Sequence, residues 1–271
     1  MLFTAWRAAA EINEFQTSMS RRVKETVQEQ DARFAYFLDV DGTLLPIAES
    51  PEVVSPSGAV CSLLSRLATA NEGALALVSG RPLHELDVMF APHRFPVAAQ
   101  HGAEIRNPGG RVTWWEGHLP SLHSVGVKMR RLADMDGRLR LEDKGLTISL
   151  HYRRAPQLGD GLTATMLEML APYRTLRLQP GKCVLEVCAA ELGKGQAVEA
   201  FMHQAPFAGR RPVYIGDDLT DESGFEAVNA MEGISIKVGP EHSVAGMHLP
   251  DPAAVLKWLA ARLPEGTGDH A

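Results

Sequence analysis

The sequence predicts an α/β protein with a Rossmann-like core of parallel strands and an inserted α+β cap domain. In the first hundred residues and again after residue 190, short apolar runs alternate with helical segments, which is typical of a parallel sheet covered by helices. Between about residues 105 and 187, polar and apolar residues alternate, which favours an antiparallel sheet with one covered face. We therefore predict a core over 31–105 and 188–271 and a cap over 106–187.

The core elements follow from run length and period. Short apolar runs without alternation, such as Phe34 to Leu38, indicate strands buried on both faces. Residues 57–70 have apolar side chains at three- and four-residue steps, which indicates a helix, and Pro82 suits the first turn of another. The core strands are predicted at 34–38, 74–78, 97–99, 213–215 and 234–238, and the core helices at 57–70, 82–89, 193–201, 221–230 and 252–263.

The cap elements have a different pattern. Residues 147–152 alternate polar and apolar side chains, which predicts a strand with one covered face. Helices are plausible near 119–135 and 157–171, and they complete the α+β composition. The cap strands are predicted at 113–116, 139–142, 146–151, 175–179 and 184–187.

Charge and cysteine content exclude several classes of protein. The chain has 271 residues, with 27 Lys and Arg against 33 Asp and Glu, and a formal net charge of −6. A general nucleic-acid binder has an excess of basic residues, so we expect no nucleic-acid partner, although a small anionic substrate remains compatible. The three cysteines suggest neither a disulfide framework nor a zinc site, and we expect free thiols in a reducing cytoplasm.

The N-terminal segment has a helical pattern of its own. Apolar residues recur at three- and four-residue steps from Ile12 to Val27, which predicts a helical extension over 1–30. It packs on its own domain or is loosely ordered, and a dimer or membrane-surface contact is the alternative. No stretch approaches the ~20 apolar residues of a membrane span. We expect a cytoplasmic protein without a membrane partner, as a monomer or weak dimer.

Four motifs place reactive side chains at strand ends or helix starts. Asp39 and Asp41 directly follow the first buried strand, and two carboxylates this close need a cation, a proton or hydrogen-bond donors. Ser79 follows the second strand. Lys194 stands between two glycines at a helix start, where a cation opposes the helix dipole and requires an anionic partner. Residues 217–222 carry four acids after another buried strand, a cluster that the oxygen-preferring Mg²⁺ explains.

Each motif alone also has a structural explanation. A lone Asp-x-Asp is often an Asx turn, or part of a calcium loop, although no ligand series continues beyond Thr43. Ser79 fits an ordinary helix cap, and Lys194 fits a solvated surface lysine. The order of all four motifs at these positions favours one shared site, because sites form at the carboxyl ends of parallel strands.

In this combination the sequence resembles the haloacid-dehalogenase-like phosphotransferases, whose motifs are Asp-x-Asp-Gly-Thr, a Ser or Thr, a Lys and an acidic cluster. The resemblance covers about residues 33–262. Within that superfamily the sequence is similar to the bacterial trehalose-6-phosphate phosphatases. The strings that carry this similarity are YFLDVDGTL at 36–44, ALVSGR at 76–81, QHGAE at 100–104, HYR at 151–153, GKCVLEV at 181–187 and GDDLTDE at 216–222.

The resemblance implies Mg²⁺-dependent hydrolysis of a sugar phosphate, trehalose 6-phosphate, through an aspartyl-phosphate. The implied catalytic residues are Asp39 as nucleophile, Asp41 as general acid and base, and Ser79 and Lys194 as phosphate-holding groups. The implied metal ligands are Asp39, the backbone carbonyl of Asp41, and Asp217. Asp218 and Asp221 are expected to orient these ligands or Lys194.

Substrate specificity is expected to lie largely on the cap, with Mg²⁺ chemistry on the core. The implied substrate-binding residues are Arg81, His101, Gly102, Glu142, Lys144, Lys182 and Glu186. The cap charges have an alternative explanation as exposed strand residues or surface ion pairs. His151 and Arg153 are expected to be cap framework, and hinges are expected near 105–108 and 188–193.

Other functions stay open at this stage. The core motifs do not separate trehalose 6-phosphate from sucrose 6-phosphate or a glycosyl-phosphoglycerate, and a phosphomutase would use the same motifs. A catalytically silent sugar-phosphate sensor would be expected to lack Asp39 or Asp41, and both are present. A structural module with acidic loops would not need Ser79 and Lys194 in this order.

Overall fold

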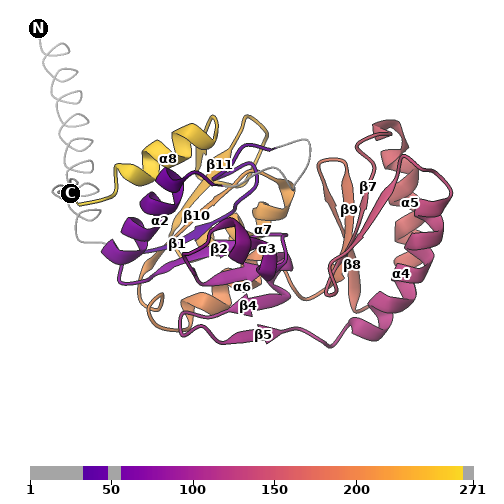
Figure 1. The fold of residues 1–271 in the computed structure, drawn as a ribbon, viewed down its shortest axis with the longest axis horizontal. Coiled ribbons are helices and arrows are strands. Elements are labelled where there is room, and N and C mark those ends of the chain that lie inside the picture. Colours follow the sequence, from indigo (N-terminus) through magenta and orange to yellow (C-terminus); the bar gives the residue numbers. More distant parts are fainter. Residues whose placement is uncertain (1–32, 48–55, 265–271) are drawn as a thin grey trace, which may run out of the picture. The chain divides into compact units, whose positions relative to one another are not determined.

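An eight-stranded sheet forms the core of the computed structural model, which describes residues 33–47 and 56–264 (Figure 1). Its strand order is β12–β11–β10–β1–β2–β3–β4–β5. The strands from β12 to β3 pair in parallel, whereas β4 and β5 extend one edge in antiparallel pairing. The bounds are β1 Phe34–Leu38, β2 Leu75–Val78, β3 Val97–Ala99, β4 Glu104–Arg106, β5 Val112–Trp114, β10 Arg211–Gly216, β11 Ile234–Val238 and β12 Met247–Leu249.

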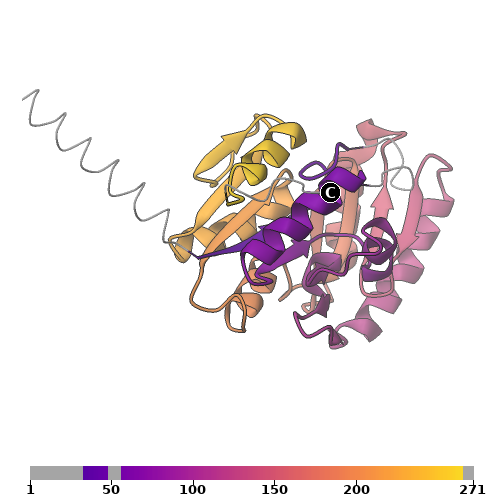
Figure 2. The same cartoon turned by 60° about the vertical axis from the view of Figure 1, so that its left-hand side comes forward.

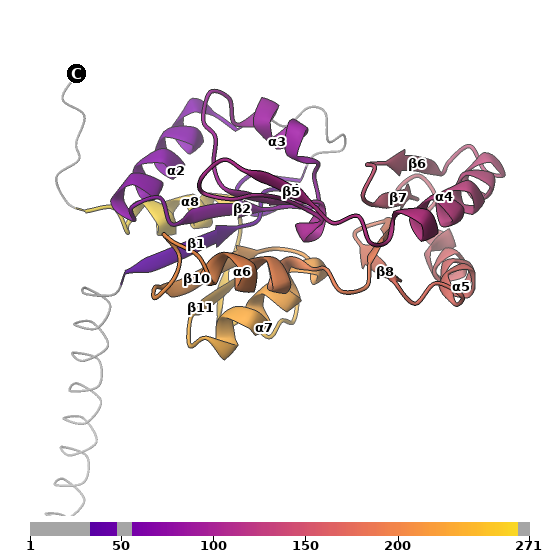
Figure 3. The same ribbon diagram turned by 90° about the horizontal axis from the view of Figure 1, so that it is seen from below.

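Helices cover both faces of this sheet, which is why the central strands β1 and β2 are apolar throughout. In β1, Tyr36 and Leu38 pack into one apolar cluster, and Ala35 and Phe37 pack into the other. Helices α2, α3 and α8 lie on the first face, and α6 and α7 lie on the second (Figure 3). The bounds are α2 Gly58–Ala70, α3 Leu83–Met89, α6 Lys194–Met202, α7 Glu222–Ala230 and α8 Pro252–Ala260.

A second, four-stranded antiparallel sheet has the order β6–β7–β9–β8. With its helices it forms the cap, which spans residues 119–189 in the structure. Helices α4 and α5 cover its outer face (Figures 1 and 2). The bounds are β6 Arg140–Asp143, β7 Ile148–His151, β8 Leu176–Gly181, β9 Val184–Ala189, α4 Leu119–Asp134 and α5 Gly159–Leu170.

The inner face of the cap sheet carries a row of polar side chains. Glu142 of β6 pairs with Ser149 of β7, Ser149 pairs with Glu186 of β9, and Glu186 pairs with Gln179 of β8. Directly paired residues point to the same face of a sheet. Their apolar neighbour Leu150 points to the opposite face and packs in the cluster under α4 and α5. We call the four residues the polar row.

The predicted α/β class is confirmed, but the first boundary between core and cap lies later in the chain than the predicted position at residue 105. Strands β4 and β5 are hydrogen-bonded to the core sheet, so the strand expected at 113–116 as part of the cap belongs to the core. The chain crosses to the cap between Trp114 and Leu119. An antiparallel extension of the core sheet has the same alternating pattern as the cap, and this similarity caused the error.

The remaining elements are short. Three-residue 3₁₀ turns occur at η2 Gln100–Gly102, η3 Pro156–Leu158 and η4 Leu219–Asp221. The predicted helical extension over 1–30 lies outside the described residues. Among the helices of the described ranges, none combines the length and apolar character that crossing a membrane requires.

Candidate active site

The predicted reactive residues meet at the carboxyl ends of the strands in the core sheet. Asp39 follows β1, Ser79 follows β2 and Asp217 follows β10, and these three strands are adjacent and parallel. Their carboxyl ends therefore lie side by side, as expected for a site in an open α/β sheet. Lys194 is the first residue of α6, and its side chain reaches these strand ends. The fold thus brings together Asp39 and Lys194, which are 155 residues apart in the sequence.

Lys194 joins two buried carboxylates. Its Nζ donates to Oδ1 of Asp39 at 2.7 Å and to Oδ1 of Asp221 at 2.6 Å, and its side chain is 3% exposed. Carboxylate oxygens of Asp39, Asp217 and Asp221 lie within 4.8 Å of one another. We call these three residues the acidic centre. Burial raises the pKa of Asp39 well above its usual value, Lys194 offsets part of this, and the two neighbouring carboxylates add to it.

Asp221, for which the resemblance implies an orienting role, makes four hydrogen bonds within the site. Its Oδ1 accepts from Lys194 and from the hydroxyl of Tyr214, at 2.6 and 2.7 Å. Its Oδ2 accepts from the backbone N–H groups of Asp217 and Asp218, both at 3.0 Å. A carboxylate has about four acceptor positions. Asp221 is therefore saturated by protein donors, and it fixes the loop that carries Asp217.

Asp39 and Asp217 fit a divalent cation. Burial raises the pKa of Asp217 as well, so a bound cation would stabilise the ionised form of both groups. The loop after β1 leaves room for Asp217, because Gly42 has a positive φ of 87° and any Cβ there would overlap the Asp217 carboxylate. Lys182 of the cap donates to Oδ2 of Asp217 at 3.1 Å. The carboxylates, their burial and their repulsion match the requirements of Mg²⁺.

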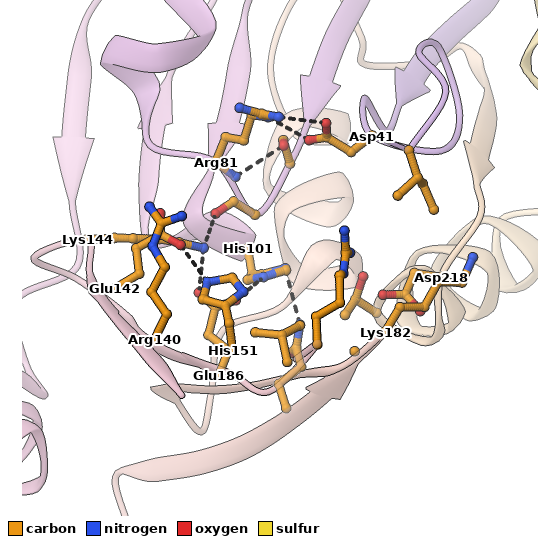
Figure 4. Close-up of a pocket in the computed structure, with 18 of the residues that line it drawn as sticks. Asp41, Arg81, His101, Arg140, Glu142, Lys144, His151, Lys182, Glu186 and Asp218 are labelled. Carbon is orange, nitrogen blue, oxygen red and sulfur yellow. Dashed lines mark hydrogen bonds and ion pairs between the residues drawn. The ribbon is translucent and has the colours of Figure 1, made fainter. Parts of the chain in front are cut away.

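Asp41 is held differently from Asp39. Arg81 donates to both of its carboxylate oxygens, with distances of 2.6 and 2.8 Å (Figure 4). The side chain of Asp41 is 37% exposed, whereas that of Asp39 is 7% exposed. Ser79 is buried beside this pair, and its Oγ accepts from the backbone N–H of Arg81 at 3.2 Å. The guanidinium therefore controls where the Asp41 carboxylate lies.

The 3₁₀ turn η2 brings the core into contact with the cap. Gln100, His101 and Gly102 all have positive φ values, of 46°, 58° and 95°, a conformation that costs energy for the two residues that carry a Cβ. His101 Nε2 lies 3.0 Å from Oε2 of Glu186, and its Nδ1 lies 3.2 Å from Nε2 of Gln179. In this arrangement Nε2 can donate to the carboxylate of Glu186 while Nδ1 accepts from the amide of Gln179. The turn thus aims His101 at two members of the polar row.

Lys144 makes a second contact between cap and core. Its Nζ donates to the backbone oxygen of Gly80 at 3.0 Å and to Oε1 of Glu186 at 3.4 Å. Burial alone would raise the pKa of Glu186, but Lys144 and His101 more than offset this and hold that pKa far below its usual range. Glu186 is therefore an ionised acceptor that faces the core.

The pairing of cap charges differs from that suggested by their spacing. Glu142 pairs with His151 at 2.7 Å, and this hydrogen bond lowers the pKa of Glu142. Lys144 instead pairs with Glu186, and Lys182 reaches Asp217 of the core. His151, expected to be framework, lies beside the site (Figure 4).

A cavity of about 820 Å³ connects the strand ends with the polar row, within the 300–1,000 Å³ range of small-molecule sites. The predicted site residues that line it are Asp39, Asp41, Ser79, Arg81, His101, Glu142, Lys144, Lys182, Glu186, Lys194, Asp217 and Asp218. Gly102 does not line the cavity, contrary to its expected substrate contact. A Cβ on Gly102 would lie 3.3 Å from the backbone oxygen of Gly193, so this glycine allows the turn to pack against α6.

Several site residues escaped the sequence prediction. Gln179 and Arg140 line the cavity. Tyr214 and Lys237 lie beneath it and bind the acidic loop. Tyr214 and Lys237 belong to buried strands, where they were interpreted as core. The available signal for Lys237 was a lysine within a predicted buried strand, because an unpaired buried charge is costly.

The fold and the site first define a class. A phosphatase of the haloalkanoate (HAD) superfamily from Bacteroides thetaiotaomicron has a solved structure that is 17% identical, with a TM-score of 0.59 over 85% of this chain and 94% of that chain. At this identity the likeness establishes the fold. The chain therefore has the fold of the HAD-like class, and it gathers carboxylates and a lysine at its strand ends.

The chain belongs to the trehalose-phosphatase family, whose model matches residues 37–249. The trehalose-6-phosphate phosphatase of Escherichia coli strain K12 is 41% identical over 243 residues, which cover 89% of this chain and 90% of that protein. The C-terminal domain of Candida albicans trehalose-6-phosphate phosphatase shares the fold, with a TM-score of 0.76, 23% identity and coverage of 86% of this chain and 93% of that chain. The family and enzyme class predicted from the motifs are confirmed.

Proposed function

We propose that this chain hydrolyses trehalose 6-phosphate to trehalose and phosphate, with Mg²⁺ as cofactor and Asp39 as nucleophile. One observation carries the proposal: a single cavity is lined by Asp39 and Asp217 of the acidic centre and by Glu142, Gln179 and Glu186 of the polar row. The acidic centre suits a metal ion and the phosphate that it binds. The carboxylate, ammonium and amide groups on the cap side of the cavity suit sugar hydroxyls. The name of the Escherichia coli relative supports trehalose 6-phosphate as the particular substrate.

The first half-reaction would transfer the phosphoryl group to Asp39. Lys194 binds Oδ1 of Asp39, which leaves Oδ2 to form a bond with phosphorus while the bond from phosphorus to the sugar oxygen breaks. Ser79 and Lys194 would hold the remaining phosphate oxygens, where charge is spread in the transition state. Mg²⁺, held by Asp39, Asp217 and the backbone carbonyl of Asp41, would supply positive charge that neutralises the phosphate.

Asp41 would move the protons. As a carboxylic acid it protonates the departing sugar oxygen, and as a carboxylate it then takes a proton from the water that attacks phosphorus. That attack breaks the bond between phosphorus and Asp39 and leaves Asp41 protonated for the next cycle. An incoming phosphate competes for the guanidinium of Arg81, so substrate binding would release Asp41 from the pair seen here.

The cap would act as a lid that recognises the sugar. Glu142, Lys144, Lys182 and Glu186 supply donors and acceptors, and Gln179 adds an amide beside them. Closure of the cap over the cavity would exclude bulk water from the aspartyl-phosphate. Both functions depend on the same inner face of the four-stranded sheet.

The test is phosphate release from trehalose 6-phosphate, glucose 6-phosphate and sucrose 6-phosphate, each with and without Mg²⁺. We expect release from trehalose 6-phosphate to exceed the other two by at least about tenfold in kcat/KM, and to require Mg²⁺. Faster release from sucrose 6-phosphate would overturn the substrate assignment. Isomerised phosphate with little free phosphate would indicate a mutase, and binding without any release would indicate a sensor.

Asp41→Asn should separate the two carboxylates by leaving group. An activated aryl phosphate has a leaving oxygen that needs no proton, so phosphoryl transfer to Asp39 should still occur. A sugar oxygen does need one, and we expect kcat for trehalose 6-phosphate to fall by about 10²–10⁴-fold. Stopped-flow release of the aryl alcohol would show a burst, followed by slow phosphate release. An equal loss of the burst and of sugar-phosphate turnover would contradict the role of Asp41.

A further inference from the structure

Lys237 is a buried lysine that the proposed chemistry does not use, and it lies in β11, the strand next to the edge strand β12. All five residues of β11 are buried, and the side chain of Lys237 is 3% exposed. Lysine is almost never fully buried unless it is paired. In the register of the sheet, Lys237 lies opposite Gly216, the residue before Asp217. Its position therefore places an ammonium group directly beneath the loop that carries the acidic centre.

The three N–H donors of Lys237 meet three acceptors. Nζ donates to the backbone oxygen of Asp217 at 2.6 Å, to the backbone oxygen of Val238 at 2.8 Å and to Oε2 of Glu241 at 3.1 Å. The bond to Asp217 is the shortest of the three and is buried, whereas the Glu241 side chain is 55% exposed. The bond to Val238 is buried as well, so the two backbone bonds are those that water does not weaken, and of these only the bond to Asp217 reaches the acidic centre.

Asp217 is thereby held at three points. Its backbone N–H donates to Asp221, its backbone oxygen accepts from Lys237, and its carboxylate accepts from Lys182. The first two contacts fix the backbone N–H and the backbone oxygen of Asp217. The carboxylate can therefore move mainly by rotation about its own side-chain torsions. Groups that orient a metal ligand commonly control metal affinity.

We infer that Lys237 is a positioning residue for the metal centre, holding the Asp217 carboxylate where Mg²⁺ needs it. The inference rests on the proposed function, because it takes Asp217 as a metal ligand. Lys237 acts through the main chain of Asp217 and does not itself line the cavity. Its ammonium group also reduces the electrostatic repulsion among the carboxylates. The positioning effect and the charge effect of Lys237 predict opposite changes in Mg²⁺ affinity when the residue is replaced.

Removal of Lys237 separates these two effects. If position dominates, Lys237→Met should weaken Mg²⁺ binding by about tenfold, because Asp217 loses its anchor. If charge dominates, the loss of a nearby cation should leave Mg²⁺ binding unchanged or tighten it. Titration calorimetry with Mg²⁺ alone, without substrate, measures this directly. Unchanged or tighter binding in Lys237→Met would overturn the inference.

Two further variants keep the test decisive. Glu241→Gln alters the exposed partner of Lys237 and leaves the Asp217 bond intact, so Mg²⁺ affinity should stay within about twofold of wild type. If Lys237→Met does not fold, Lys237→Arg keeps the charge but cannot direct three N–H groups from one nitrogen. Several-fold weaker Mg²⁺ binding in Lys237→Arg supports positioning, and wild-type affinity overturns it.

The kinetic readout distinguishes positioning from a general loss of stability. In Lys237→Met the Mg²⁺ concentration for half-maximal activity should rise by the same factor as the calorimetric Kd, with an unchanged KM for sugar phosphate at saturating Mg²⁺. A lower Tm with an unchanged Kd would indicate a structural role and overturn the inference alone. A wild-type chain that binds no Mg²⁺ would overturn the proposed function and this inference together.

Discussion

Asp39→Asn is expected to lower turnover of trehalose 6-phosphate by roughly 10⁴-fold or more, because an amide oxygen does not form the covalent intermediate. The fold should survive, since Asn has nearly the same volume and Lys194 retains Asp221 as a buried partner. Steady-state phosphate release and a thermal melt measure the two effects. Residual activity above about a tenth of wild type would contradict the role of Asp39.

The covalent intermediate supplies an independent check. Quenching wild-type turnover with borohydride should reduce an aspartyl-phosphate to homoserine at position 39, which peptide mass spectrometry detects. The Asp39→Asn chain should show no such mass change. Asp251→Asn is a matched control, because Asp251 caps α8, does not line the cavity, and is replaced by an equally good N-cap residue. It should keep full activity.

Lys194→Met is expected to lower the free energy of unfolding by about 3–5 kcal/mol, the usual cost of leaving buried charges without a partner. Lys194 is the cation that bonds to both Asp39 and Asp221. Its loss leaves two buried carboxylates facing each other, and turnover should fall along with stability. Urea unfolding at neutral pH measures the change, and added Mg²⁺ should restore part of the lost stability.

A double-mutant cycle tests the origin of this loss. Because the repulsion requires both charges, Asp39→Asn should recover part of the stability lost in Lys194→Met. Lys257→Met provides the control, since Lys257 is an exposed helix residue whose replacement should change stability by less than about 0.5 kcal/mol. If Lys194→Met is as stable as wild type without Mg²⁺, the assignment of Lys194 as the central counter-charge is wrong.

The core fold was predictable because its buried strands are short and mainly apolar. Phe34–Leu38, which is apolar throughout, and Ile234–Val238, which also contains Ser235 and Lys237, were both located to the residue. The boundary at 105 failed because β5, which is an edge strand, has polar and exposed positions like a cap strand. Periodicity reports how many faces of a strand are covered, but it does not report to which sheet the strand belongs.

The candidate site was predictable where function depends on strand ends. Asp39, Ser79 and Asp217 follow three buried strands, and parallel pairing alone brings them together. The cap pairings were not predictable, because they depend on register and on how cap and core meet. Gly102 was misassigned for a related reason: its motif identifies a special turn, but only the structure shows that the turn packs on α6.

The contacts that join cap and core have a consequence for substrate choice. Glu186 and Lys144, expected to bind sugar hydroxyls, are here bonded to His101 and to the backbone of Gly80. A sugar must exchange these bonds for its own hydroxyl contacts in order to settle in the cavity. We expect a disaccharide, which carries hydroxyls on two rings, to replace more of these bonds than a single ring does. Discrimination between sugar phosphates would then depend on how many contacts between cap and core the sugar can replace while its phosphate lies at the strand ends.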